Sequence, residues 1–339
     1  MARDLAQRLL NAVLSLVGVA VLIFLITEIL PGDPARVAAG PYATPDQIAT
    51  IRQNYGLNAS LLHQFGNYLT NLLQGDLGNS IQTGQPVRSE LTSRLAATLE
   101  LTLTALIIAV VVGVALGAVS AMYRYRLLDR VLHLIIAAVS ATATFWIALL
   151  AIATLVNRMH VFDSPVGRLP AGFPAPGHRT GFFVIDALTE GNFVVASQAL
   201  KTLIFPAALL GLTASPSIAK VVRSAMIQAF SSDYVRTSRS FGYSTTSIVL
   251  RDALRNSLLP VLTTVGLVAG FLIGGDVIIE QIFSWPGIGQ YAYNALQQND
   301  LFALRGFVIL VGLAYVLVNT GLEVGYRWID PRVSSHDAA

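Results

Sequence analysis

The chain contains no cysteine, so disulfides and thiolate metal sites are excluded and nothing indicates the redox compartment. Charge is scarce as well. Only 12% of the 339 residues are charged and 54% are hydrophobic, whereas a typical soluble domain has about 25% charged residues. These proportions predict a multi-span membrane protein. The net charge of +3 is then better explained by orientation in a membrane than by binding to nucleic acid.

Motifs of catalytic chemistry are missing too. The chain has only two lysines, Lys201 and Lys220, and neither lies in a G-x-x-x-x-G-K-[ST] loop that would hold nucleotide phosphates. The histidines form no H-E-x-x-H pair for zinc, and no G-x-S-x-G nucleophile motif occurs. We therefore expect a protein that is not an enzyme and binds no cofactor of its own.

Apolar segments of the length that crosses a bilayer, about 20 residues, occur six times. They are Leu9–Leu30, Leu99–Met122, Val131–Val156, Leu203–Val222, Leu258–Phe283 and Ala303–Ile329. Leu9–Leu30 is too long for the core of a signal peptide, so it is interpreted as a retained span. Pro206 and Pro216 predict a kink in the fourth segment. The expected fold is an all-α membrane protein with six transmembrane helices.

Basic residues predict the orientation. Arg124, Arg126 and Arg130 lie between the second and third spans, and the loop 220–257 carries six more basic residues. Positive charge favours the cytoplasmic side, so both loops and both termini are expected there. The chain is accordingly divided into residues 1–30 (tail and first span), 31–95 (extracytoplasmic segment), 96–330 (five-helix core with the loop 220–257) and 331–339 (tail).

The loop 220–257 contains a short, self-contained helix pattern. Ser231, Ser232 or Asp233 is suited to cap its start, and Gly242 to end it in the left-handed conformation. The helix between them has about eight residues, fewer than the ~12 that an isolated helix needs in water. We therefore expect it to dock on another protein.

Three further patterns have competing interpretations. Gly113-x-x-x-Gly117 favours tight helix packing. Ser140 to Thr144 supplies hydroxyls that either line a polar path or bond back to their own helix. The ionisable residues in or near spans are expected mostly to snorkel or to cap helix ends, with Asp276 the deepest and either structural or pathway-lining. They are Glu28, Glu100, His133, Asp276, Glu280 and Glu323.

Several short motifs together resemble the B-type permease subunits of ABC importers for dipeptides, oligopeptides and nickel. The main one runs from Arg236-Thr237-Ser238 through Gly242 to Leu258-Leu259-Pro260, and it resembles the EAA loop of these permeases. The others are Leu30-Pro31-Gly32-Asp33-Pro34, Gly75-Asp76-Leu77-Gly78-Asn79-Ser80, Thr83-Gly84-Gln85-Pro86-Val87, Trp285-Pro286-Gly287-Ile288-Gly289-Gln290 and Asp330-Pro331-Arg332-Val333. Arg236-Thr237-Ser238 replaces the Glu-Ala-Ala of the wider superfamily, as in this subfamily.

The resemblance implies a type I ABC-importer permease fold in the bacterial plasma (inner) membrane. It implies a second homologous permease, two ATPase subunits that bind ATP and magnesium, an extracytoplasmic binding protein, and no nucleic acid. The short helix would be the coupling helix, with Tyr234, Arg236, Thr237, Ser238, Phe241 and Gly242 at the ATPase contact. Asp276, Trp285, Pro286 and Gly287 would lie at the outer mouth or contact the binding protein.

The expected function is import of dipeptides or oligopeptides; nickel chelates and glutathione stay open as cargo. An ion-coupled secondary transporter of a small solute is the main alternative, although midplane charges are few. An intramembrane hydrolase is a weaker one, because paired aspartates are missing. Tyr234 and Phe241 either anchor the partner or pack on the chain's own span ends, and Arg236 and Arg239 either pair with the partner or only set orientation.

Overall fold

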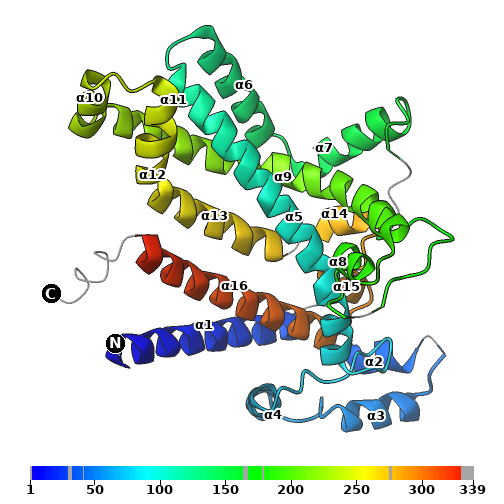
Figure 1. Cartoon of the computed structure of the whole chain (residues 1–339). Helices are drawn as coiled ribbons and strands as arrows, with labels where there is room; N and C mark the ends of the chain where they lie inside the picture. Colours follow the sequence, from blue (N-terminus) through cyan, green and yellow to red (C-terminus); the bar gives the residue numbers. More distant parts are fainter. Residues whose placement is uncertain are drawn as a thin grey trace. The chain divides into compact units, whose positions relative to one another are not determined.

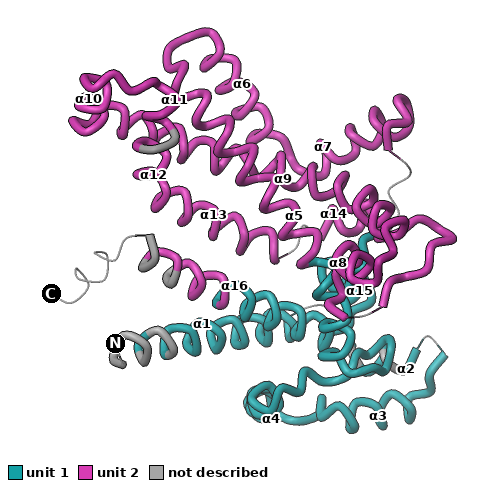
Figure 2. The backbone as a smooth tube through the Cα atoms, in the orientation of Figure 1, with its two compact units in different colours: residues 1–98, 285–316 teal, residues 99–284, 317–339 magenta. Residues whose placement is uncertain are grey.

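The structure, a computed structural model, describes residues 2–29, 33–40, 42–162, 167–177, 179–274 and 277–329, and these are almost entirely helical (Figure 1). They divide into two compact units (Figure 2). Unit 1 contains residues 1–98 and 285–316, and unit 2 contains residues 99–284 and 317–339. The helices α5 (Val87–Met122) and α16 (Leu301–Ile329) each contribute to both units. The all-α prediction is thus confirmed.

Unit 1 surrounds one hydrophobic cluster. Besides its parts of α5 and α16 it contains α1 (Ala2–Ile29), α2 (Pro34–Ala39), α3 (Pro45–Asn54), α4 (Leu61–Leu73) and α15 (Ile288–Gln297). Val87 and Leu91 of α5 are buried together with Ile288 and Tyr291 of α15 and with Ala303 of α16. The cluster therefore holds α15 against the first turns of α5 and α16.

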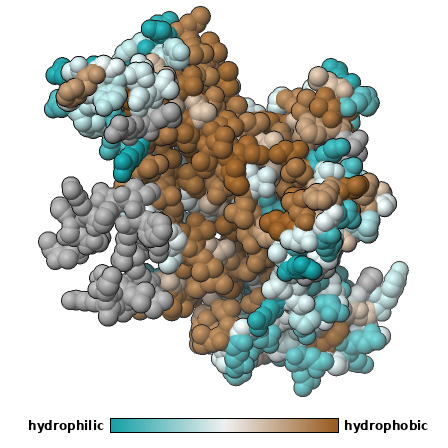
Figure 3. Space-filling view, viewed as in Figure 1, coloured by the Kyte–Doolittle hydropathy of each residue, from teal (hydrophilic) through white to brown (hydrophobic). Residues whose placement is uncertain are grey.

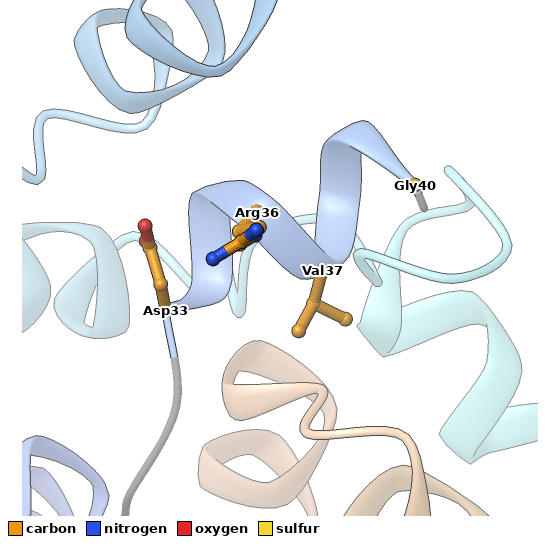
Figure 4. Close-up of a pocket in the computed structure, with 4 residues that line it drawn as sticks. All are labelled: Asp33, Arg36, Val37 and Gly40. Atoms are coloured by element: carbon orange, nitrogen blue, oxygen red, sulfur yellow. The ribbon is translucent and has the colours of Figure 1, made fainter. Parts of the chain in front are cut away.

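The segment after α1 folds through local caps. Thr44 and Gln47 form a reciprocal capping box at the start of α3. Asp33 caps α2 and also forms an ion pair with Arg52 of α3, at 2.5 Å. Asp33, Arg36, Val37 and Gly40 line a cavity of about 290 Å³ along α2 (Figure 4). Asp33, which belongs to the Leu30–Pro34 motif, thus joins α2 to α3.

A buried arginine connects three helices of unit 1. Arg305 of α16 donates from Nε to Thr27 Oγ1 at 2.8 Å and from Nη2 to Glu28 at 2.9 Å. Its guanidinium also lies over the rings of Phe24 and Tyr68, 4.8 and 5.6 Å from their centroids. Glu28 is therefore an ion-pair partner.

Unit 2 is built around the long helix α9 (Phe193–Phe230). Its other elements are α6 (Leu127–Ala141), α7 (Thr144–Ala151), the π-helix η1 (Ile152–Val156), α8 (Phe183–Thr189), α10 (Asp233–Ser240), α11 (Thr245–Ser247), the π-helix η2 (Ile248–Ala253), α12 (Leu254–Asn256), α13 (Leu258–Ile273) and α14 (Val277–Ile282). α9 packs against α6, α7, α8 and α13. It is one continuous helix through both Pro206 and Pro216.

Glycines bring the backbones of α5 and α9 into direct contact. A Cβ added to Gly113 would lie 2.8 Å from Ile218 Cβ, and one added to Gly117 would lie 2.6 Å from the carbonyl oxygen of Ala219. From the other side, a Cβ on Gly211 would lie 2.7 Å from the carbonyl oxygen of Ala105. No side chain fits at these positions, so the tight-packing interpretation of Gly113-x-x-x-Gly117 is confirmed.

The spans differ in one respect from the expectation. Among the described residues, four helices are long and apolar enough to cross a membrane: parts of α1 and α16, and all of α5 and α9. The predicted third span breaks after Ala141, and α6 meets α7–η1 at a bend of 103°, so continuity over Val131–Val156 was wrong. The predicted fifth span contains the 16-residue α13. The count of six and the position of the termini stay predictions.

Hydrophobic and hydrophilic residues lie in different parts of unit 2. On the face in Figure 3 hydrophobic residues cover α5, α9 and α13, and hydrophilic ones gather around α10. In unit 1, hydrophilic residues cover the region of α3. This distribution fits apolar helices in a bilayer with polar segments at their ends.

Candidate functional site

The loop after α9 forms the short helix that the sequence predicts. α10 runs from Asp233 to Ser240, eight residues. Gly242 follows its C-cap with φ +77°. Gly242 N–H donates to the Arg239 carbonyl at 3.0 Å and Tyr243 N–H to the Ser238 carbonyl at 3.2 Å. These two bonds are the Schellman pattern, in which a left-handed residue after the cap satisfies the last carbonyls. Gly242 as the helix stop is confirmed.

The start of α10 differs from the expectation in one detail. Ser232 occupies the N-cap position, but its side chain makes no capping bond. Its hydroxyl instead donates to the carbonyl of Ala229 in the last turn of α9, at 2.5 Å. A hydroxyl cap at Ser232 was therefore wrong. Asp233 in the first turn still complements the positive end of the helix dipole.

α10 is anchored to its own chain on one side only. It packs against α9 and η2, and Val235 is fully buried. Ser238 donates to Asp252 of η2 at 2.9 Å. Ser238, Tyr243, Ser247 and Asp252 border a cavity of about 140 Å³ beneath the helix. Sequence reasoning missed Val235 and Asp252, because nothing in the local pattern tells which face of α10 lies on the protein.

The other side of α10 is open. Tyr234 and Phe241 are 41% and 77% exposed, and Arg236, Thr237 and Arg239 are exposed as well. The two aromatic rings are thus not buried against the chain's own spans. An exposed aromatic pair flanked by arginines has the composition of a protein-binding surface. We call Tyr234, Arg236, Thr237, Arg239 and Phe241 the open face of α10.

A polar cluster lies at the α10 end of three helices. Arg223 of α9 donates from Nε and Nη2 to the two carboxylate oxygens of Asp129 in α6, at 3.0 and 2.9 Å. Ser120 of α5 donates to the same carboxylate at 2.5 Å and also accepts from Arg223. The backbone N–H of Tyr125 binds the other oxygen. The cluster joins the last turn of α5 to the first turn of α6 and to α9 about two turns before its end.

The Trp285–Gly287 segment is placed within unit 1. The Trp285 side chain is 1% exposed and donates from Nε1 to the Ala97 carbonyl at 2.9 Å. Gly287 is the N-cap of α15. Only Pro286 of the three is exposed. Asp276 lies outside the described residues. A contact of this segment with a binding protein stays a prediction.

The loop between η1 and α8, which is rich in glycine and proline, is held by two buried charged residues. Arg168 pairs with Glu100 of α5 at 2.5 Å, donates to the Gly181 carbonyl at 2.7 Å and lies 3.5 Å from the centre of the Phe183 ring. Burial lowers the pKa of Arg168, although Glu100 opposes that shift. Glu100 is thus a buried ion-pair partner and does not snorkel. Its other carboxylate oxygen accepts from the backbone N–H of Val184 at 3.0 Å, so it also caps the start of α8.

Asp186 of α8 holds the same loop. Its carboxylate accepts from the backbone N–H and hydroxyl of Thr180, at 2.9 and 2.7 Å, and from the Gly181 N–H at 2.9 Å. Burial alone would raise the pKa of Asp186, but these hydrogen bonds outweigh it and hold the pKa below its ordinary value. The loop therefore depends on an ionised Asp186.

Two family models match nearly the whole chain. Residues 113–335 match the binding-protein-dependent transport system inner membrane component family, and residues 1–102 match the N-terminal part of such membrane components. Among solved structures, an inward-facing MetNI methionine ABC transporter aligns with a TM-score of 0.54 at 15% identity, covering 71% of this chain and 96% of that chain. This similarity shows the fold.

Curated relatives match over nearly their full length. A probable D,D-dipeptide transport system permease of Escherichia coli K12 is 41% identical, with 97% of this chain and 96% of the relative covered. A dipeptide transport system permease of Alkalihalophilus pseudofirmus is 36% identical over 96% and 98%. A glutathione transport system permease of Salmonella choleraesuis is 36% identical over 96% and 97%. The chain therefore belongs to the binding-protein-dependent transport system inner membrane components, as a multi-pass permease subunit of an ABC importer in the bacterial plasma membrane.

Proposed function

We propose that this chain is one of two homologous permease subunits through which dipeptides or other small peptides enter a bacterial cell. Its relatives over the full length are named for dipeptide, D,D-dipeptide and glutathione transport, and all three cargoes are small peptides. An extracytoplasmic binding protein delivers the peptide to the outer mouth. Pro286, the exposed residue of the Trp285–Gly287 segment, is the residue that we assign to that mouth.

The observation that carries the mechanism is the open face of α10. The helix is fixed to its own chain through Val235 and Ser238, while Tyr234 and Phe241 are exposed. A partner that binds the open face can therefore move α10 together with α9 and η2. We assign that partner as one of two ATPase subunits that bind ATP and magnesium, because this chain lacks a nucleotide-binding motif.

Arg236 and Arg239 favour a partner whose contact surface is negatively charged. Both are exposed on a helix that has one acidic residue, Asp233, in its first turn. Complementary charge on a partner speeds encounter and fixes the register more than it adds affinity. We therefore expect acidic residues around an aromatic-accepting groove on the ATPase.

The experiment is ATP-driven uptake by the purified complex. The chain is co-expressed with its genomic neighbours, reconstituted in proteoliposomes with ATP inside, and supplied with a labelled dipeptide and the binding protein. Uptake is expected only with ATP and only when the ATPase subunits are present. Uptake by the isolated chain, or uptake that a proton or sodium gradient drives without ATP, would refute the proposal and favour a secondary carrier.

A further inference from the structure

Lys220 is a cation on a membrane-spanning helix without a carboxylate partner among the described residues. Its ammonium donates to Ser140 Oγ of α6 at 3.0 Å, and the side chain is exposed. Three residues later, Arg223 is neutralised by Asp129. α9 itself contains no acidic residue. These two neighbouring cations of α9 therefore differ: Arg223 is paired with a carboxylate of the chain, and Lys220 has only a hydroxyl.

The position of Ser140 shows that the ammonium lies far from the Asp129 cluster along α6. Asp129 and Ser140 both belong to α6 and are eleven residues apart, which is about 16 Å along a helix axis. The Arg223 side chain contacts α6 at Asp129, whereas the Lys220 side chain contacts it at Ser140. Ser140 also lies next to the bend where α6 ends at Ala141. A charge that an apolar span carries into lipid is costly and marks a functional site unless it is solvated or paired.

Lys220 belongs to a polar stripe on α9. Thr213, Ser217, Lys220, Ser224 and Gln228 recur at helical spacing and fall within a sector of about 80° at 100° per residue. All except half-buried Thr213 are exposed. The opposite face carries buried Ile218, Ala219, Val222 and Met226. This half of α9 is thus apolar toward its own chain and polar on the outside, the reverse of a surface made for lipid.

We propose that this stripe borders the aqueous path of the transporter and that the Lys220 ammonium binds the carboxylate of the passing peptide. The inference rests on the proposed import of peptides, which supplies a ligand with a carboxylate. Charge complementarity selects the anionic end of the peptide, because the stripe offers one ammonium, three hydroxyls and an amide but no acid. Ser140 holds the ammonium when no peptide is present.

The first test measures transport. In the reconstituted complex, Lys220→Met is expected to lower uptake of a dipeptide with a free carboxylate by about tenfold or more. This is the effect expected when one charge-assisted hydrogen bond to the cargo is lost. Uptake of the same dipeptide with an amidated carboxylate is expected to stay unchanged by the substitution. Lys220→Arg should restore most of the activity. Lys201→Met, at the other end of α9, is the matched control and should leave both cargoes unaffected.

The second test does not depend on transport. Because the chain has no cysteine, Ser217→Cys introduces a unique thiol one turn from Lys220. We expect it to react with water-soluble methanethiosulfonates, severalfold faster with an anionic than with a cationic reagent. That preference should vanish with Lys220→Met and persist with Lys201→Met. An unreactive thiol, or reactivity without charge preference, would overturn the inference.

The outcomes separate the inference from the function on which it rests. If the wild-type complex takes up no peptide, the proposed function fails, while the labelling still reports on the stripe. If it takes up peptide and Lys220→Met affects free and amidated cargo equally, the carboxylate site is wrong. Loss of the second permease from the purified Lys220→Met complex would mean that an acid of that subunit pairs with Lys220, which also overturns it.

Discussion

Arg223 and Asp129 form a two-point ion pair in which each carboxylate oxygen accepts one guanidinium N–H, at 3.0 and 2.9 Å. The side chains are 21% and 6% exposed. Removing one partner of such a pair leaves an uncompensated charge, which costs about 3–5 kcal/mol when the pair is buried. Because α6 and α9 meet here, the pair fixes the two helices at the end nearest α10.

Asp129→Ala should therefore lower the thermal midpoint of the detergent-purified protein, by an amount that matches several kcal/mol of unfolding free energy. Arg130→Gln is the control, because Arg130 is the exposed neighbour on the same helix. Its midpoint should not change. Equal midpoints for Asp129→Ala and the wild type would show that the pair contributes nothing to stability.

Gly117→Leu should destabilise unit 2 by more than an ordinary overpacked site, which costs about 1–3 kcal/mol. The added side chain meets the backbone carbonyl of Ala219, which cannot rotate away. Gly18→Leu in α1 is the matched control, since a Cβ there meets nothing within 4 Å. Size-exclusion profiles after heating should separate the two variants. A stable, monodisperse Gly117→Leu protein would contradict the close helix contact.

Gly242→Val should abolish ATP-driven uptake while the protein still inserts into the membrane. Gly242 has φ +77°, and a left-handed conformation costs an L-residue about 1–2 kcal/mol, most for a branched one. Gly242→Asn is the comparison, because asparagine tolerates this region and serves as a helix stop. It should retain much of the uptake. If both substitutions were equally harmful, backbone conformation would not be the reason.

Acid should loosen the glycine- and proline-rich loop before α8 only at low pH. The pKa of Asp186 is below its ordinary value in the folded protein, so its stabilisation is complete at neutral pH and is lost as pH falls below the ordinary carboxyl value of about 3.9. Limited proteolysis between Gly167 and Glu190 should therefore stay slow from pH 7 to about pH 4. Asp186→Asn should be cleaved readily across that range. Loosening of the wild-type loop already near pH 6 would contradict the shift.

The parts that sequence predicted well depend on neighbouring residues. The end of α10 requires a left-handed residue at Gly242, and the contact at Gly113 and Gly117 requires two small residues one turn apart. Both requirements are visible in a few consecutive residues and do not depend on the rest of the chain. The family motifs were equally local, and their order along the chain predicted the permease family.

The parts that sequence did not predict depend on distant residues. Glu100 and Arg168 are 68 positions apart, and Asp129 and Arg223 are 94 apart, so neither pair follows from helical spacing. The helix break after Ala141 could not be predicted from a proline or glycine, because neither occurs next to it. The Thr142 hydroxyl donates a hydrogen bond to the Ala138 carbonyl at 2.8 Å. Such a side-chain bond to the backbone is one way in which a helix can end without proline or glycine.

The glycine contact between α5 and α9 has a mechanical consequence. Two helices that touch through their backbones cannot slide past each other without a clash at Gly117 or Gly211. α9 is 38 residues long, or about 57 Å, and Ser232 at its end is bonded to its last turn. A displacement of α9 along its axis is therefore passed on to α5 at these glycines. The two helices must shift together, so a partner that pushes on one of them moves both.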